Sequence, residues 1–260
     1  MQRTIDFSTF SSIKIGPSIQ VEVIDEIRDY RDFIIIGGAN NLLVSPNPPR
    51  LAILDKKFDF IYEKDGLLHI GGATTSGKIL SYAKKHDIAN FELMQKLPGT
   101  LGGIVKMNAG LKEWEIFNHL VAVKTEFGWI NRSDIEYGYR YTKFNGIVFE
   151  AKFERIQGFN KELLHMFKQF RDNQPNLPSA GSCFKNPKEN FAGKLLDESG
   201  LKGYRIGNMA FSNTHANFLV NMGGGTFEEA ITLIEKAKKT VLEKTDVELE
   251  LEIKILGHKI

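Results

Sequence analysis

The segment Ile36-Gly-Gly-Ala-Asn-Asn-Leu-Leu-Val44 joins two apolar runs through two glycines and two carboxamides. This pattern predicts a strand that ends in a loop, because glycine and asparagine are typical turn residues. Glycine also lets a phosphate approach backbone N–H groups, and the asparagine amides can donate as well. An ordinary strand and turn has the same composition, so both interpretations stay open at this point.

A second glycine-rich segment, Pro98–Gly110, begins Pro-Gly-Thr-Leu-Gly-Gly and ends Asn-Ala-Gly. Glycines in a turn before a short helix suit a pyrophosphate held by backbone amides. They equally suit close packing of a helix on a sheet. Two such loops in one domain favour an extended ligand, a dinucleotide. No intact G-x-G-x-x-G follows a predicted strand, so we do not expect a Rossmann site.

The composition is that of an ordinary globular protein, with nothing that indicates a dedicated nucleic-acid or membrane surface. The 260 residues carry 34 basic and 32 acidic side chains, a formal net charge of +2. Cys183 is the single cysteine, which excludes an internal disulfide and favours a reducing compartment. We see no signal-peptide apolar region and no apolar run of membrane-spanning length, so we expect a cytoplasmic protein.

Periodicity predicts an α+β chain with mixed sheets and a boundary near residues 155–165. Apolar residues at helical spacing predict helices over residues 76–86, 161–170, 191–199 and 226–244. Short apolar runs predict strands over residues 19–24, 33–36, 51–54, 58–62, 67–70, 121–125, 128–130 and 147–153, with a hairpin turn at 63–66. Val247–Ile255 alternates apolar and charged residues, which predicts a closing strand.

A third loop, Gly72-Ala-Thr-Thr-Ser-Gly-Lys78, follows a predicted strand and precedes a predicted helix. It matches the phosphate-binding pattern G-x-x-x-x-G-K-[ST] until Ile79, which lacks the hydroxyl that would bind magnesium. A P-loop nucleotide-binding protein therefore remains an alternative. With one cysteine and no His-x-x-x-His pair, the sequence predicts no zinc or other metal site.

Two polar positions outside these loops are candidates for chemistry. Arg140 lies in Tyr137-Gly-Tyr-Arg-Tyr-Thr-Lys-Phe144, where aromatic rings can shield a guanidinium for bidentate carboxylate binding. A surface arginine stacked on tyrosine is the commoner case. Glu252 lies on the polar face of the closing strand, and a functional role there requires burial and a cationic partner.

The segment Ala180-Gly-Ser-Cys-Phe-Lys-Asn-Pro187 places a hydroxyl, an ammonium and a carboxamide close together. Ser182, Lys185 and Asn186 can hold a polar substrate and offer it a proton. A strand end followed by a turn is the simpler interpretation, with Pro187 as its stop signal. Cys183 alternates with Ser182, so we expect the thiol to point to the opposite side and pack.

These segments, in this order, resemble the UDP-N-acetylenolpyruvoylglucosamine reductase family, the UDP-N-acetylmuramate dehydrogenases of bacterial cell-wall synthesis. The similarity extends over nearly the whole chain, and the short length is similar to the shorter class of the family. Further matching segments are Thr9-Phe10, Lys14–Gly16, Ala192–Leu196, Gly200–Gly203, Arg205–Gly207, and Ser212 with His215–Asn221.

The resemblance implies an FAD-binding domain of the vanillyl-alcohol-oxidase type over residues 1–158, with subdomains of about 1–56 and 57–158, and a C-terminal α+β substrate-binding domain over 159–260. It implies bound FAD, NADPH as co-substrate, and reduction of UDP-N-acetylglucosamine enolpyruvate to UDP-N-acetylmuramate. We expect small-molecule partners, neither nucleic acid nor membrane, and a monomer. The alternative is another FAD-dependent oxidoreductase of the same fold with a different substrate.

The family's catalytic residues fall on Arg140, Ser182 and Glu252 of this sequence, and Lys185 and Asn186 are the expected substrate-binding residues. The positions expected to contact FAD are Gly37, Gly38, Ala39, Asn40, Asn41, Leu42, Pro98, Gly99, Thr100, Gly102, Gly103, Asn108 and Ala109. The chain departs from the family pattern at Ala39-Asn40, where Gly-Ser is usual, and at Lys96, where glycine is usual.

Overall fold

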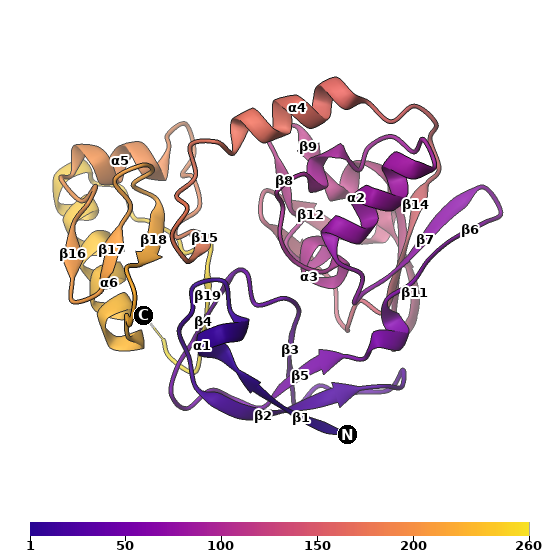
Figure 1. The fold of residues 1–260 in the computed structure, drawn as a ribbon, viewed down its shortest axis with the longest axis horizontal. Coiled ribbons are helices and arrows are strands. Elements are labelled where there is room, and N and C mark those ends of the chain that lie inside the picture. The colour runs from indigo at the N-terminus through magenta and orange to yellow at the C-terminus, as the bar shows by residue number, and fades with distance from the viewer. Residues whose placement is uncertain (260) are drawn as a thin grey trace. The chain divides into compact units, whose positions relative to one another are not determined.

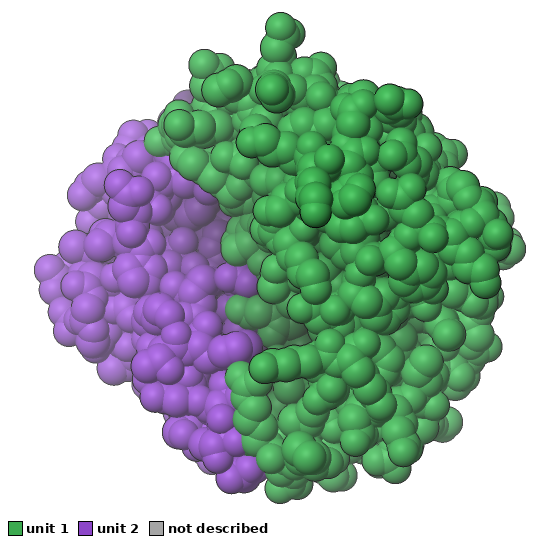
Figure 2. Space-filling model, turned by 45° about the vertical axis from the view of Figure 1, so that its right-hand side comes forward, with its two compact units in different colours: residues 1–3, 21–38, 50–172 green, residues 4–20, 39–49, 173–260 purple. Residues whose placement is uncertain are grey.

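The computed structural model describes residues 1–259, and these residues form two compact units (Figure 2). Unit 1 comprises Met1–Arg3, Val21–Gly38 and Arg50–Asp172, and unit 2 comprises Thr4–Gln20, Ala39–Pro49 and the chain from Asn173 onward. Each unit has its own buried core. The units describe packing, whereas the expected domains 1–158 and 159–260 describe binding roles, so that division stays a prediction.

Unit 1 is built on a five-stranded antiparallel sheet (Figure 1). Its order is β11 (Gly128–Asn131), β10 (Leu120–Thr125), β14 (Glu150–Glu154), β7 (Leu67–Gly71) and β6 (Ile61–Lys64). The helices α2 (Ser76–Lys85) and α3 (Leu101–Lys106) bury their apolar side chains against it. The predicted hairpin is present, but its turn is shorter than the predicted range 63–66: Glu63 and Lys64 belong to β6, and Asp65 and Gly66, with φ angles of 51° and 74°, form a two-residue turn.

Smaller elements of unit 1 surround this sheet. A second sheet has the order β1 (Gln2–Asp6), β2 (Ser18–Ile24), β5 (Leu51–Leu54) and β3 (Ile34–Ile36), and its residues 4–6 and 18–20 are assigned to unit 2. Two hairpins pair β8 (Gly110–Leu111) with β9 (Trp114–Glu115), and β12 (Glu136–Gly138) with β13 (Tyr141–Lys143). Single turns of 3-10 helix are η1 (Lys56–Phe58), η2 (Glu92–Met94), η3 (Ile116–His119) and η4 (Arg132–Asp134).

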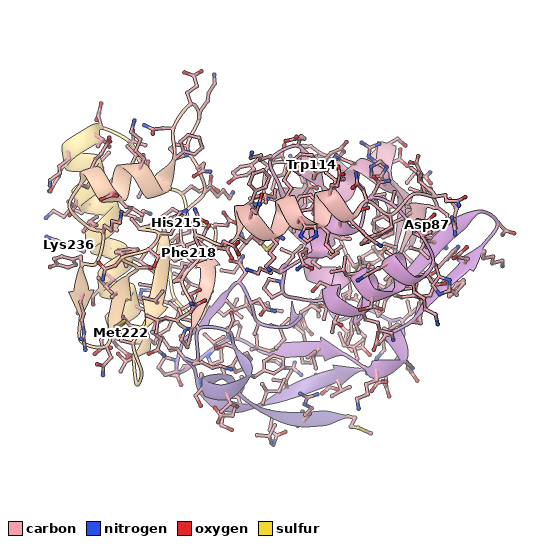
Figure 3. All side chains as sticks on the ribbon, turned by 45° about the horizontal axis from the view of Figure 1, so that its top comes forward. Asp87, Trp114, His215, Phe218, Met222 and Lys236 are labelled. Carbon is pink, nitrogen blue, oxygen red and sulfur yellow. The ribbon has the colours of Figure 1, made fainter. Side chains whose placement is uncertain are left out.

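Helix α4 (Lys161–Phe170) closes unit 1 and packs on the β8–β9 hairpin. Its buried Phe167 contacts Trp114 edge to face, with ring centroids 5.4 Å apart, and Trp114 lies beside α4 in Figure 3. Asn160 caps the helix by accepting hydrogen bonds from the backbone of Glu162 and Leu163. The predicted range of this helix is confirmed.

Unit 2 is an antiparallel sheet covered by two helices. The sheet order is β15 (Ser179–Ser182), β18 (Phe218–Asn221), β17 (Met209–Phe211) and β16 (Arg205–Ile206). Helices α5 (Ala192–Glu198) and α6 (Phe227–Thr245) share one apolar core with this sheet. Thr226 and Glu229 form a capping box at the start of α6. The short helix α1 (Phe7–Phe10) and the parallel pair β4 (Leu42–Val44) and β19 (Lys254–Leu256) complete the unit.

The predicted closing strand over Val247–Ile255 is wrong in extent. Only β19 belongs to a ladder, and Leu251 makes an isolated bridge to Phe184. The apolar–charged alternation arises because an extended segment can bury one side without regular pairing. Two other predicted strands have wrong bounds. The strand predicted over residues 58–62 is displaced to β6 (Ile61–Lys64), because Phe58 belongs to η1, and β14 begins at Glu150 rather than at residue 147.

Within residues 1–259, no helix combines the length and the apolar character that a membrane span requires.

Candidate active site

The two glycine-rich loops of the sequence analysis meet in unit 1 at Gly37 and Thr100. A Cβ added at Gly37 would lie 2.6 Å from the Thr100 hydroxyl, so a larger residue would collide with the second loop. At Gly103, an added Cβ would meet nothing within 4 Å, and the residue is exposed. Gly99 has a φ of 119°, a conformation that side chains disfavour. The backbone is therefore open at Gly103, whereas Gly37 is confined by Thr100.

Gly102 has a packing role instead. Its N–H donates to the Gly72 carbonyl at 2.9 Å, and an added Cβ would lie 3.2 Å from the same oxygen. Leu101 N donates to Thr74 O at 2.9 Å. Gly72 in turn leaves no room for a side chain, since its Cβ would lie 1.9 Å from Val148 O. The packing interpretation is therefore realised at Gly102 and Gly72, while phosphate binding at the other glycines stays a prediction.

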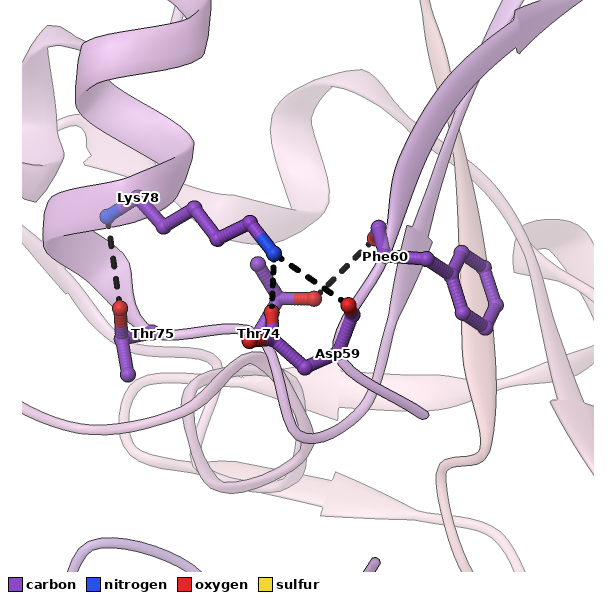
Figure 4. Close-up of polar contacts among 5 residues, drawn as sticks. All are labelled: Asp59, Phe60, Thr74, Thr75 and Lys78. Carbon is purple, nitrogen blue, oxygen red and sulfur yellow. Dashed lines mark hydrogen bonds and ion pairs between the residues drawn. The ribbon is translucent and has the colours of Figure 1, made fainter. Parts of the chain in front are cut away.

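In the third glycine loop, Gly72–Lys78, the side chains of Thr74, Thr75 and Lys78 form hydrogen bonds or ion pairs with other groups of the protein (Figure 4). The Lys78 ammonium pairs with the Asp59 carboxylate at 2.8 Å. Thr74 donates its hydroxyl to Phe60 O at 3.1 Å, and the Thr75 hydroxyl caps α2 by accepting from Lys78 N at 3.4 Å. Because the lysine and both hydroxyls are engaged in this way, the geometry gives the P-loop alternative no support.

Arg140 lies at the tip of the β12–β13 hairpin in a left-handed conformation, with φ 62°. This region is uncommon for residues other than glycine and occurs preferentially at functional sites. The guanidinium donates to Gly110 O at 3.0 Å and lies 4.9 Å from the Tyr139 ring centroid. The expected aromatic shielding is therefore present on one side, and the arginine is only partly buried.

Asn108 braces the hairpin that carries Arg140. The side chain is fully buried and donates to Glu115 Oε2 at 2.7 Å and to Gly138 O at 3.1 Å. Its carbonyl oxygen accepts from Phe117 N at 3.3 Å. The neighbouring residue Ala109 donates its N–H to Ile104 O at 2.9 Å. These polar groups, expected to contact FAD, hold unit 1 together in this structure.

Arg171 is a buried cation near Arg140 that sequence analysis missed. It lies directly after α4, and its guanidinium donates to Leu93 O at 3.2 Å and to Gln95 O. Burial, together with the positive charge of Arg140, lowers the pKa of Arg171 to about 10. Sequence analysis had no signal for this residue, because burial of an arginine depends on how α4 packs.

Both departures from the family's glycines fall in the left-handed region. Ala39 has a φ of 49° and Lys96 a φ of 55°. Glycine adopts these angles without the steric cost that a Cβ brings, so the glycines that the resemblance leads us to expect at both positions would relieve this strain. Lys96 compensates in part through an ion pair with Asp172 at 2.7 Å, next to Arg171.

In unit 2, Ser182 and Glu252 lie on neighbouring segments. Ser182 ends β15, is partly buried, and pairs with Phe218 of β18. The next residue, Cys183, accepts a hydrogen bond from Glu252 N at 2.9 Å through its carbonyl. The Cys183 thiol is fully buried, and burial, followed by the nearby Glu252 charge, raises its pKa. The expectation that Cys183 packs in the interior is confirmed.

Asn41 ties the first glycine loop to the segment of Glu252. Its side-chain amide donates to Glu252 O at 3.0 Å, and its carbonyl accepts from Lys254 N at 2.9 Å. Ala39 O accepts from Ser12 N at 3.2 Å in the same unit. This loop therefore fixes the main chain at Glu252, in addition to any ligand that it binds.

Lys185 and Asn186, the expected substrate-binding residues, also have local partners. The Lys185 ammonium pairs with Glu250, whose side chain is 73% exposed while that of Lys185 is 17% exposed. The Asn186 carbonyl oxygen accepts from Ala192 N at 3.1 Å, at the start of α5. A substrate that binds these side chains has to compete with one exposed ion pair and one helix-terminal hydrogen bond.

Comparison with known proteins finds relatives along the whole chain. The family model described as "UDP-N-acetylenolpyruvoylglucosamine reductase, C-terminal domain" matches residues 173–256. A Helicobacter hepaticus protein named UDP-N-acetylenolpyruvoylglucosamine reductase is 48% identical over 97% of this chain and 98% of its own length. A Campylobacter jejuni protein of the same name is 44% identical over 97% of this chain and 99% of its own.

A solved structure gives the same result for the fold. The crystal structure of UDP-N-acetylenolpyruvylglucosamine reductase from Thermus caldophilus superposes with a TM-score of 0.85 at 25% sequence identity. It covers 99% of this chain and 100% of that chain. The expected α+β fold class is confirmed by this similarity.

Proposed function

Because this chain belongs to the UDP-N-acetylenolpyruvoylglucosamine reductase family, we propose that it is an oxidoreductase that converts UDP-N-acetylglucosamine enolpyruvate to UDP-N-acetylmuramate for peptidoglycan synthesis. The observation that carries the proposal is the hydrogen bond from Glu252 N to Cys183 O at 2.9 Å. It keeps Ser182 and Glu252 on adjacent segments, as two groups that act on one substrate require.

The bare backbone of the glycine loops fits FAD, which we propose as the bound cofactor with NADPH as co-substrate. At Gly103 an added Cβ would meet nothing within 4 Å, so a pyrophosphate can approach the main chain there. We propose Gly37, Gly99 and Thr100 as further contacts. We also assign cofactor contacts to Gly38, Ala39, Asn40, Asn41, Leu42 and Pro98. When bound, FAD supplies the hydride chemistry, accepting hydride from NADPH and delivering it to the enolpyruvyl group.

Arg140 is the proposed partner of the enolpyruvyl carboxylate. Charge moves toward this carboxylate when hydride adds to C3 and C2 becomes enolate-like. A guanidinium fixed by Gly110 O and Tyr139 meets that charge without reorganising, and such fixed donors stabilise a transition state more than mobile ones do. Arg140 adopts its left-handed conformation at a cost in backbone strain, which is common at functional sites.

Ser182 is the proposed proton donor to C2, and Glu252 the proposed stabiliser of the same intermediate. An isolated hydroxyl is a weak acid, so it donates only to a strongly basic carbon at hydrogen-bond range. Gly181, with φ 80°, directly precedes Ser182, and an added Cβ at Gly181 would meet nothing within 4 Å. Lys185 and Asn186 are the proposed substrate-binding groups next to Ser182.

The test is spectroscopic and separates the two halves of the reaction. Purified protein is expected to show the absorbance bands of bound flavin, to lose them when NADPH is added without oxygen, and to regain them with the enolpyruvyl substrate. A colourless protein would contradict the cofactor. Bleaching by NADPH without recovery on adding this substrate would favour the alternative, another FAD-dependent oxidoreductase of the same fold.

A further inference from the structure

Asn217 is a buried polar residue that contacts the segment directly after Ser182. Its side chain is 3% exposed and lies just before β18. The Asn217 carboxamide accepts from Phe184 N at 3.0 Å and donates to Phe184 O at 2.8 Å. The main-chain carbonyl of Asn217 also accepts from Cys183 N at 2.7 Å. Three hydrogen bonds from one residue thus hold two consecutive residues.

These bonds replace a sheet ladder that stops at Ser182. The β15–β18 pairing shifts register between Ser179 and Ser182, and β15 ends there. A carboxamide has the same donor and acceptor as a peptide group, so Asn217 serves as a strand neighbour for Phe184 where no regular strand continues. A buried peptide group without such a partner destabilises the folded protein.

The opposite edge of the same segment carries Glu252. Cys183 O accepts from Glu252 N at 2.9 Å and from Ile253 N at 3.4 Å. Cys183 C=O and Phe184 N–H are the two ends of one planar peptide group. The N–H of this peptide group donates to Asn217, and its carbonyl accepts from Glu252 N. A rotation of the peptide would therefore break the bond to Asn217 and displace the main chain at Glu252.

We propose that Asn217 is a positioning residue for the reduction reaction: by fixing the Cys183–Phe184 peptide it sets the relative positions of Ser182 and Glu252. The inference rests on the proposed function for its catalytic part. Its structural part, the restraint on one peptide group, stands on the hydrogen bonds alone.

Asn217 is itself held in place, as a positioning residue must be. Its N–H donates to His215 Nδ1 at 3.3 Å, and the His215 ring packs edge to face on Phe218 with centroids 5.0 Å apart (Figure 3). Burial lowers the pKa of His215, which favours the neutral ring that can accept this hydrogen bond. Asn217 is therefore preorganised before any substrate binds.

The first test compares Asn217→Ala with Asn221→Ala. Asn221 is a matched control, also 3% exposed, whose amide donates to Ile13 O at 3.1 Å and accepts from Gly223 N and Gly225 N at 2.9 Å. Asn217→Ala is expected to keep NADPH-driven flavin reduction and to slow substrate-driven reoxidation at saturating substrate by about 10–100-fold. Asn221→Ala should change stability and leave the ratio of the two rates as in the wild type.

Wild-type reoxidation in Asn217→Ala, or equal slowing in both variants, would overturn the assignment. Asn217→Asp covers the case in which the alanine variant does not fold. The aspartate carboxylate can accept from Phe184 N but cannot donate to Phe184 O, whereas the protonated acid can do both. Its reoxidation rate relative to wild type should therefore rise as the pH falls, and a flat ratio would contradict the proposal.

A readout without substrate separates this inference from the proposed function. Hydrogen exchange at the Phe184 amide and labelling of the Cys183 thiol should both accelerate in Asn217→Ala and stay slow in Asn221→Ala. Unchanged Phe184 exchange would overturn the positioning role even in an active enzyme. Faster exchange in a protein whose wild type is never reoxidised by the enolpyruvyl substrate would instead overturn the proposed function.

Discussion

The proposed catalytic residues are held in two different ways. In unit 2, Ser182 and Glu252 lie on extended segments joined by main-chain hydrogen bonds through Cys183. In unit 1, Arg140 sits at a hairpin tip with φ 62°. A left-handed residue other than glycine costs about 1–2 kcal/mol, so the contacts around the hairpin have to offset strain that unit 2 does not carry at these positions.

Because of this difference, we expect a substitution at Ser182 to change activity with little effect on stability. A substitution at Arg140 should change both activity and stability. Main-chain hydrogen bonds do not depend on the side chain at Ser182, so a substitution there should remove the hydroxyl and little else. At Arg140, the side chain and the strained backbone belong to one residue, so a substitution changes the charge and the strain together.

The largest expected effect is that of Ser182→Ala. NADPH should still bleach the flavin at the wild-type rate, while reoxidation by the enolpyruvyl substrate should fall by about 10²–10⁴-fold, the usual contribution of a general acid. Stopped-flow absorbance measures both rates. Ser179→Ala, on the same strand, is the control and should leave both rates unchanged. Normal reoxidation in Ser182→Ala would show that another group is the acid.

Arg140→Gln should reduce substrate-driven reoxidation by about 10²–10³-fold, because it removes a fixed positive charge from the developing anion. The loss should appear at saturating substrate, in kcat, and NADPH-driven bleaching should continue. The control is Arg155→Gln, whose guanidinium pairs with Glu63 at 3.1 Å. Equal losses in the two variants would mean that net charge, and not the position of Arg140, matters.

Lys106, which contacts the β12–β13 hairpin, should make the stability of unit 1 depend on pH. Lys106 donates from its ammonium to Phe144 O at 2.9 Å, and its carbonyl accepts from the Thr142 hydroxyl at 2.9 Å. Burial lowers the pKa of Lys106 from 10.5 to about 8. Between these values the unfolded chain binds more protons than the native protein, so the free energy of unfolding should rise with pH across this window.

Urea unfolding at several pH values measures this effect as the difference between wild type and Lys106→Met. The wild type should gain stability relative to the variant as the pH rises from about 8 toward 10.5, the window set by the two pKa values. A difference that is constant with pH, or that shrinks, would contradict the assignment of this slope to Lys106.

The smallest expected effect is the difference in stability between glycine and alanine variants at positions 140 and 182. It tests the comparison most directly, because the sign of this difference should be opposite at the two positions. At position 140, the glycine variant should be more stable than the alanine variant by about 1 kcal/mol, since the left-handed turn disfavours a Cβ. At position 182, on an extended strand, glycine should be less stable than alanine by about 0.5–1 kcal/mol. Thermal unfolding of the four variants decides, and the same sign at both positions would remove the distinction.

Regular elements were the part of the fold that the sequence predicted well. Helix α4 (Lys161–Phe170) and strand β5 (Leu51–Leu54) have the predicted ranges, and α6 (Phe227–Thr245) differs by one residue at each end. These elements bury one face with a clear period, so local pattern and final structure agree. Val247–Ile255 shows the limit, because alternation reports burial on one side and not the presence of a pairing strand.

The sequence predicts which residues form the candidate site, but it does not predict their conformation or burial. Ser182, Glu252 and Arg140 were found through motif resemblance, but the strained turn at Arg140 and the burial of Arg171 depend on how distant elements pack. For Asn217, the sequence offers only its place in the family-like segment His215–Asn221. Its role follows from hydrogen bonds to residues that lie 33 positions earlier in the chain, which no local pattern encodes.

Unit 2 combines segments from both ends of the chain, Thr4–Gln20 and the residues from Asn173 onward, and this affects folding during synthesis on the ribosome. The Asn221 amide donates to Ile13 O across 208 residues of sequence, and β4 pairs with β19 at the other end of the chain. At about 5–20 residues per second, the 208 residues between these partners take about 10–40 seconds to make. During that time Thr4–Gln20 has been translated without this native partner. A nascent chain of this protein is therefore expected to be a chaperone client until its last strand emerges.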